Sequence, residues 1–217
     1  MQLVKIMLVL AMVSLLAADA EAGKWDLEAF GGYRWGGDLS DGSYADDPDN
    51  PVNVSDLHFT SGPSWGLSAG YNINERFEIK LKFDRQHTSF DFTNDRLGVD
   101  ESLGNAKLDY VMAGVAINLV PEDYKLKPYF AFYLGATHLT PDDSSRDSSW
   151  YSALGYALGA RYFFTEHIGV MVENTGESSI MTDGATLFCS DDDQCITIPK
   201  DTWMWQIGLS AGVVFTF

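Results

Sequence analysis

The sequence has few cysteines, few basic residues and, after its first residues, no long apolar run. Its 217 residues include two cysteines and 14 lysines and arginines, against 31 aspartates and glutamates. The formal net charge of −17 argues against nucleic acid as a partner, because binding to a phosphate backbone depends on basic side chains. No later stretch approaches the roughly 18 consecutive apolar residues of a membrane-spanning helix.

The two cysteines, Cys189 and Cys195, enclose the sequence Ser-Asp-Asp-Asp-Gln. An even number of cysteines in an exported chain favours a local disulfide, which we expect here. Closing so short a loop stabilises the fold by only ~2 kcal/mol on the chain-entropy estimate. A metal or redox site is the alternative, but the pair lacks partner ligands and Cys-x-x-Cys spacing. We therefore expect no cofactor.

Residues 1–22 have the features of a signal peptide. Lys5 supplies the positive start, residues 6–16 form the apolar run, and small residues flank two cleavage positions. The run is too short to span a bilayer as a helix. We expect cleavage after Ala22, which leaves residues 23–217 as one domain.

Glycine and aromatic residues are plentiful, with 20 glycines, 13 phenylalanines, 10 tyrosines and six tryptophans. Together with short alternating runs, this composition predicts an all-β chain. The clearest run is 202–217, in which every odd position from Trp203 to Phe217 is apolar and most even positions are small or polar. Such a strand has one apolar face, and it exceeds the roughly 9–11 residues that a tilted strand needs to cross a bilayer.

Eight segments alternate in this way and are predicted as strands: 25–35, 63–73, 77–92, 106–119, 128–138, 150–164, 168–173 and 202–217. Their connections are short at 74–76, 121–127 and 165–167, and mostly long and acidic at 38–62, 93–105, 139–149 and 175–201. This layout predicts an eight-stranded antiparallel transmembrane β-barrel, with short periplasmic turns and long extracellular loops. Closure would leave no unpaired strand edge in lipid.

The aromatic residues are predicted to form belts at the two ends of the barrel. The belt at the long-loop ends comprises Trp35, Trp65, Trp150, Trp203 and Trp205, and the opposite belt comprises Phe77, Tyr129, Phe164 and Phe217. A soluble sandwich or lipocalin-like barrel is the alternative. The second face of the strands combines glycine with charge, which suits a narrow polar interior better.

Several segments resemble those of known outer-membrane proteins. The terminal Val213–Phe217 is similar to the signature read by the barrel-assembly machinery, with Phe215 and Phe217 as its aromatic residues. Residues 158–165, 127–129 and 30–37 resemble other segments of the same group. Over its whole mature length, the chain resembles the outer-membrane β-barrel domain superfamily of small proteins such as OmpA, OmpX and OmpW.

This resemblance implies location in the outer membrane of a Gram-negative bacterium, with loops extracellular and both termini periplasmic. Its implied partners are outer-membrane lipid, lipopolysaccharide and, during biogenesis, the assembly machinery. It does not imply an activity, because members share an architecture rather than a function.

Charged side chains on the inward face are expected to form an ion-pair network that fills the lumen, since eight strands leave room for little else. The alternative is the lining of a narrow pore. The residues concerned are Glu28, Arg34, Glu78, Lys80, Lys82, Asp84, Arg161 and Glu173.

Two other kinds of site are weaker predictions. His138 and the neighbouring Asp142 and Asp143 offer a possible hydrolytic His-Asp pair, but no serine motif accompanies them and the other histidines are scattered. The acidic stretches 46–49 and 191–193 offer oxygen ligands for divalent cations, although neither has the spacing of a calcium loop. A solvated acidic rim is the simpler interpretation.

The sequence therefore predicts a non-enzymatic envelope protein with a structural or surface-binding role. A narrow channel for small or hydrophobic solutes, as in the OmpW group, is the first alternative. A lipid-modifying enzyme is the second.

Overall fold

The computed structural model describes residues 25–39, 42–45, 52–94, 99–121, 124–143, 148–181, 186–187, 195–197 and 202–217. The predicted signal peptide lies outside these residues, as do Cys189 and the side chain of Cys195, which concern the predicted disulfide. Across these ranges, no helix is long and apolar enough to cross a membrane.

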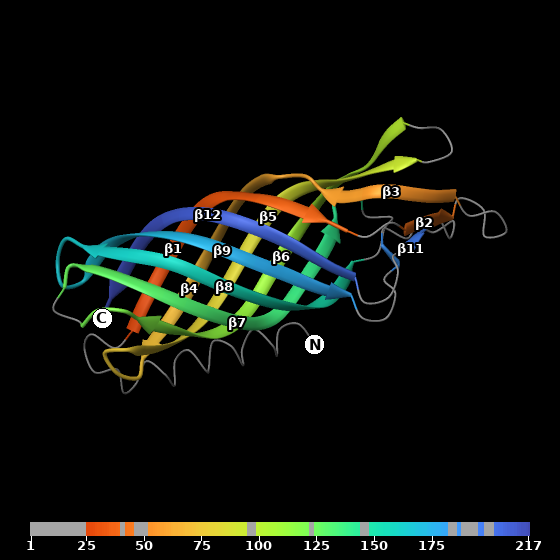
Figure 1. Cartoon of the computed structure of the whole chain (residues 1–217). Coiled ribbons are helices and arrows are strands. Elements are labelled where there is room, and N and C mark those ends of the chain that lie inside the picture. The colour runs from red at the N-terminus through yellow and green to blue at the C-terminus, as the bar shows by residue number, and fades with distance from the viewer. Residues whose placement is uncertain are drawn as a thin grey trace, which may run out of the picture.

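Eight long strands form a closed antiparallel barrel (Figure 1). They are β1 (Trp25–Asp38), β4 (Gly62–Asn72), β5 (Phe77–Asn94), β6 (Val99–Asn118), β7 (Leu126–Pro141), β8 (Ser149–Phe163), β9 (Ile168–Met181) and β12 (Thr202–Thr216). Each pairs with the next, and β1 closes the ring by pairing with both β4 and β12. The predicted fold class is confirmed.

The barrel has a stagger of ten residues. Paired positions followed around the ring from Trp150 on β8 pass through all eight strands and return to β8 at Ala160. Strand number and stagger together fix the diameter, and eight strands leave an interior that side chains just fill.

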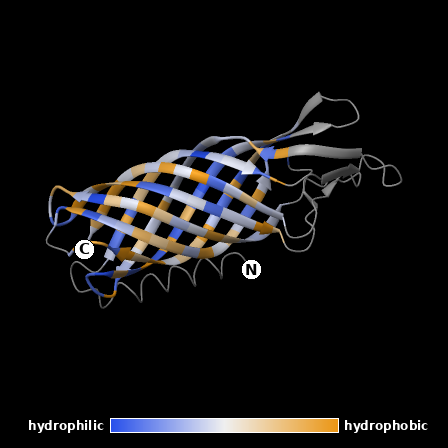
Figure 2. Cartoon of the chain, in the orientation of Figure 1, coloured by the Kyte–Doolittle hydropathy of each residue, from blue (hydrophilic) through white to orange (hydrophobic). Residues whose placement is uncertain are grey.

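Alternation along each strand separates two faces of the barrel wall. On β12 the odd positions, such as Trp205 and Ile207, are exposed on the outside, whereas Met204 and Gln206 are buried inside. Figure 2 shows the same mixture of hydrophobic and hydrophilic positions along every strand of the barrel. The alternation in 202–217 thus predicted the two faces of this strand correctly.

The long-loop end contains more strand than the sequence predicted. The expected loop 38–62 holds β2 (Gly42–Ala45) and β3 (Val52–Phe59), and β5 and β6 continue as a hairpin through most of the expected loop 93–105. Short strands β10 (Thr186–Leu187) and β11 (Cys195–Thr197) lie within 175–201. These segments lack a continuous alternation of apolar residues in the sequence, and backbone pairing with neighbouring strands defines them.

We call the end of the barrel with these extensions the loop end and the opposite one the turn end; Figure 1 shows β3 and the β5–β6 hairpin reaching beyond the barrel at the loop end. All five tryptophans of the predicted belt are 44–61% exposed. One residue of the opposite belt was wrongly predicted, since Tyr129 is buried in the lumen. The alternation of β7 places Phe130 and Phe132 outward, and therefore Tyr129 inward.

We expect the folded protein to migrate differently on a denaturing gel before and after boiling. Every barrel strand is hydrogen-bonded to a neighbour on both sides, so no strand edge is exposed at which detergent could separate the strands at room temperature. Electrophoresis of a refolded sample, heated and unheated, measures this directly. Identical mobility of the two samples would contradict a closed barrel.

Candidate functional site

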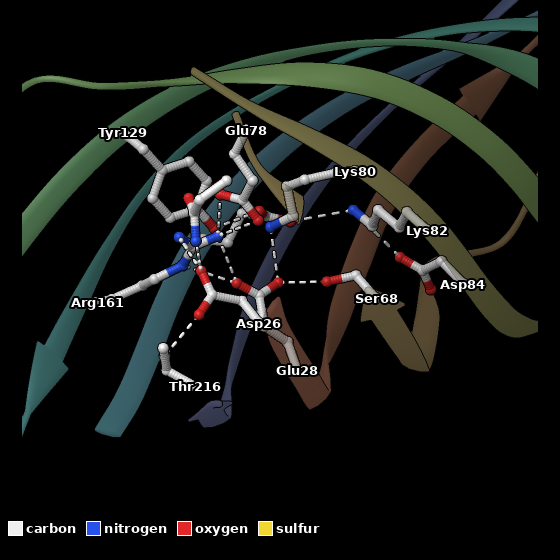
Figure 3. A network of polar contacts seen from close by, with 12 residues as sticks. Asp26, Glu28, Ser68, Glu78, Lys80, Lys82, Asp84, Tyr129, Arg161 and Thr216 are labelled. Atoms are coloured by element: carbon white, nitrogen blue, oxygen red, sulfur yellow. Dashed lines mark hydrogen bonds and ion pairs between the residues drawn. The ribbon is translucent and has the colours of Figure 1, made fainter. Parts of the chain in front are cut away.

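Among the described residues, the lumen of the barrel holds ten acidic or basic side chains that are each at most 4% exposed. Six are acids and four are bases, and they extend inward from β1, β5, β8 and β9 (Figure 3). All eight residues of the predicted network are among them, together with Asp26 and Glu177. They form two groups along the barrel axis.

The turn-side cluster comprises Asp26, Glu28, Glu78, Lys80 and Arg161. The Arg161 guanidinium donates from Nε to Glu28 Oε1 at 2.8 Å, from Nη1 to Asp26 Oδ2 at 3.3 Å and from Nη2 to Glu78 Oε2 at 2.8 Å. Lys80 Nζ donates to the other Glu28 oxygen at 2.7 Å, and Ser68 Oγ also donates to it. One guanidinium thus holds three carboxylates from two strands.

The middle cluster comprises Arg34, Lys82, Asp84, Glu173 and Glu177. Arg34 Nη2 pairs with Asp84 Oδ2 at 2.6 Å and with Glu177. Lys82 Nζ lies 3.0 Å from Glu173 Oε1 and 3.3 Å from Glu177 Oε1. Arg34 Nη1 and Asp84 Oδ1 have no hydrogen-bond partner within the part of the chain that the structure describes. This cluster is therefore less completely satisfied than the turn-side cluster.

Tyr129 joins the two clusters. Its hydroxyl donates to Glu173 Oε2 at 2.5 Å, while Arg161 and Lys80 lie 4.7 and 4.9 Å from its ring centroid. Such cation–π contacts are stronger in a desolvated site. Gly159 makes room for the ring, because a Cβ at this position would collide with it. The glycine on the inward face of β8 is thus required for the network.

A layer of hydroxyl and amide groups follows the middle cluster toward the loop end. Tyr110 Oη donates to Gln206 Oε1 at 2.9 Å, and Gln206 Nε2 donates to Gln86 Oε1 at 2.9 Å. Thr137 and Ser179 share a hydrogen bond of 2.7 Å in the same region. These uncharged groups separate the ion pairs from the apolar side chains beyond them.

An apolar cap closes the loop end. Its members are Leu39, Leu57, Phe59, Phe90, Leu108, Leu139, Met181 and Met204, all buried. The Phe59 and Phe90 rings meet edge to face at 4.8 Å, where β3 pairs with the extended part of β5. The extension of the sheet beyond the barrel therefore supplies side chains that cover the lumen.

A small cavity lies at the turn end of the lumen. Its volume is about 20 Å³, and polar residues including Asp26, Asn72, Asn118 and Arg161 line it. A cavity needs roughly 10–15 Å³ of such volume to hold one water molecule. The space therefore suits a water molecule or two and not a solute.

Of the predicted hydrolytic residues, His138 and Asp142 have other partners. Asp142 Oδ1 pairs with Lys107 Nζ at 2.6 Å, whereas His138 Nδ1 lies 3.3 Å from Thr140 Oγ1 and its ring stacks on Trp150. His167 hydrogen-bonds to the carbonyl of Thr216 at the turn end. A catalytic triad requires its members in mutual contact, and these histidines are not placed in that way.

The described residues contain no metal-binding cluster of acidic, histidine or cysteine side chains. Within the described ranges, no group of three or more histidine, cysteine, aspartate or glutamate side chains is placed to hold a metal ion. The acidic stretches 46–49 and 191–193 lie outside those ranges.

Sequence reasoning missed two acids of the lumen, Asp26 and Glu177, and assigned Tyr129 to the outer belt. Glu177 has the same alternation as Glu173, but it fell in a segment predicted as loop. Asp26 alternates with Glu28 and was recognisable from that spacing. Tyr129 was assigned to the wrong face because its position near a strand end also suits a belt residue.

A family model described as the outer membrane protein beta-barrel domain matches residues 6–217. Among curated proteins, none matches the sequence. The fold is similar to that of Neisserial surface protein A (NspA), with 17% identity, a TM-score of 0.55 and coverage of 91% of this chain and 100% of that chain. The outer membrane protein OprG from Pseudomonas aeruginosa is 15% identical, with a TM-score of 0.57 and coverage of 89% of this chain and 97% of that chain. The outer membrane protease OmpT from Escherichia coli is 10% identical, with a TM-score of 0.46 and coverage of 89% of this chain and 97% of that chain.

Proposed function

This chain belongs to the outer-membrane β-barrel domain family and resides in the bacterial outer membrane, and from that premise we propose a non-conducting, non-enzymatic envelope protein. Its role is to stabilise the membrane or to present a binding surface at the loop end. We place the loop end outside the cell and both termini in the periplasm. The tryptophan belt and the acidic connections at the loop end support this orientation.

The filled lumen is the observation that carries this proposal. Ion pairs occupy its turn side and middle, a hydroxyl and amide layer follows, and the apolar cap covers the loop end. A conducting pore needs a continuous hydrated path, and a lumen filled by paired side chains of opposite charge does not favour one. The arrangement of these charged residues therefore supports the ion-pair network and not the alternative prediction of a pore lining.

We expect the refolded mature protein to leave a planar lipid bilayer silent. With the lumen filled, no ion-sized path connects the two ends, so voltage produces no discrete current steps. Single-channel recording measures this, with the gel-mobility shift confirming that the inserted protein is folded. Reproducible steps of uniform size would contradict the proposal and favour a narrow channel.

The arrangement of the histidines supports a non-enzymatic role. His138 is engaged at the loop end and His167 at the turn end, so neither has a serine and a carboxylate in triad geometry among the described residues. The binding surface that we propose therefore lies on the acidic loops at the loop end. Lipopolysaccharide and divalent cations are the partners we propose for the acidic loops, since carboxylates and cations together bind phosphate groups.

The last residue is proposed to act as an assembly signal. Phe217 makes two backbone hydrogen bonds to Trp25, and its ring is exposed on the outer wall. We expect Phe217→Ala, which keeps those backbone bonds, to lower the amount of folded protein in the outer membrane several-fold. Phe164→Ala is the matched control, because it removes another exposed ring from the turn end. Equal membrane levels for the two variants would exclude recognition of the terminal ring by the assembly machinery.

A further inference from the structure

The outer wall of the barrel contains an apolar groove that crosses β6, β7 and β8. Its volume is about 490 Å³. We call it the outer groove; it is lined by Ala113, Gly114, Val115, Phe132, Tyr133, Leu134, Leu154, Gly155, Tyr156 and Trp205.

Two rows of outward side chains form the walls of the outer groove. One row pairs Ala113 with Leu134 and Leu134 with Leu154; the next row pairs Val115 with Phe132 and Phe132 with Tyr156. The positions between the rows are Gly114, Tyr133 and Gly155. The Tyr133 side chain is buried in the lumen, where Lys82 lies near its ring, so the floor between the two rows has no outward side chain.

Small residues on β9 extend the depression toward β12. Leu154 pairs with Ser178, and Ser178 pairs with Trp205, so the serine stands between two large side chains. The neighbouring outward position is Gly176, where a Cβ would collide with the Tyr156 ring. The Ser178 hydroxyl is buried and has no hydrogen-bond partner among the described residues. Trp205 can therefore form the far wall.

Charged side chains lie above the outer groove, nearer the loop end of the same wall. Arg85 donates from Nε and Nη2 to the two oxygens of Asp109, each at 2.6 Å, and Nη1 makes no further hydrogen bond to a described residue. Within the same part of the chain, Lys107 donates one hydrogen bond, to Asp142, although its ammonium group has three donors. The row of paired positions runs from Trp65 through Arg85, Asp109 and His138 to Trp150. This sequence of aromatic and charged groups is typical of the boundary between hydrocarbon and headgroups.

We propose that this wall binds one phosphorylated membrane lipid, with an acyl chain along the outer groove and the phosphate beside Arg85 and Lys107. The protein resides in the outer membrane, so the hydrocarbon of the bilayer faces this wall. A guanidinium and an ammonium with unused donors suit a phosphate, while the neutral pairs with Asp109 and Asp142 keep both bases in place. The proposal does not depend on whether the lumen conducts or on which side the loop end faces.

The test counts lipid molecules retained by the full mature protein after refolding with phosphatidylglycerol and transfer to detergent, by native mass spectrometry. We expect the wild type to retain one lipid. Ala113→Phe fills the outer groove and should reduce retention at least tenfold, whereas Ala29→Phe, on the outer face of β1, should leave it unchanged. Arg85→Gln and Lys107→Gln together should reduce retention several-fold.

A second measurement locates the bound acyl chain relative to Trp205, which lines the outer groove. Phosphatidylglycerol with brominated chains should quench wild-type tryptophan fluorescence, and Trp205→Phe should remove a quenched component. Equal retention by Ala113→Phe and Ala29→Phe, both confirmed as folded by the gel shift, would overturn the proposal. So would a dimer that lacks lipid and that Ala113→Phe converts to monomer, since the groove would then be an interface between copies. Unchanged retention in the Arg85 and Lys107 variant would overturn the phosphate contact.

Discussion

Arg161→Met is expected to lower the free energy of unfolding by about 3–5 kcal/mol, the range for removing one partner of a buried ion pair. Its guanidinium binds Asp26, Glu28 and Glu78, which are at most 4% exposed, so its removal leaves buried carboxylates without this partner. Of these three carboxylates, Lys80 pairs with Glu28 in the described structure and does not replace Arg161 for the other two. Urea unfolding in lipid vesicles, followed by tryptophan fluorescence, measures the difference.

Arg76→Met is the matched control for Arg161→Met. Arg76 is exposed in the connection between β4 and β5, and its removal should change stability by less than about 0.5 kcal/mol. Arg161→Lys keeps the charge but presents no planar fork to three carboxylates, so it should rescue only part of the loss. If Arg161→Met were as stable as Arg76→Met, the turn-side cluster would not contribute to stability.

Phe90→Ala is expected to destabilise the barrel by about 3–5 kcal/mol, the range for removing a buried aromatic side chain. Phe90 is 0% exposed in the apolar cap, and its ring packs edge to face on Phe59. The cap lies over the lumen, where no lipid can fill the cavity that the substitution creates. The same unfolding experiment detects the loss.

A double-mutant cycle tests whether the cap acts as a unit. Phe59→Ala and Phe90→Ala together should cost less than the sum of the single changes, with a coupling of about 0.5–1.5 kcal/mol for an aromatic pair. Phe77 lies near the opposite end of β5, so the effects of Phe77→Ala and Phe90→Ala on the free energy of unfolding should add. If the effects of Phe59→Ala and Phe90→Ala on the free energy of unfolding simply added, the contact between the two rings would contribute nothing to stability.

The strand positions were predictable because one physical rule governs them. A wall between lipid and a filled lumen needs alternation, and β12 and the first part of β1, before its irregularity at Gly36 to Asp38, show it. The same rule placed Glu28, Lys80 and Lys82 inside before any contact was known. It did not predict their partners, because Arg161 and Glu28 are 133 residues apart and meet across the lumen.

β3 shows why alternation failed at the loop end. Val52 and Val54 alternate in one phase, and Leu57 and Phe59 alternate in the other. The change of phase lies where the pairing with β5 is irregular, between Ser55 and His58. A bulge of this kind hides a strand from any search for a continuous period of two. The apolar cap could therefore not be predicted, since two of its members are on this strand.

The pairing of β1 with β12 also governs how the chain reaches this structure. Trp25 and Phe217 exchange both of their backbone hydrogen bonds, and Thr216 donates to Asp26 across 190 residues of sequence. Contacts between the two ends of a chain form slowly, because a long loop must close first. Until that closure, Arg161 on β8 lacks Asp26 and Glu28, which are both on β1. The ion pairs that join Arg161 to β1 therefore form only when the seam closes, whereas pairs such as Lys82 with Glu173 do not require it.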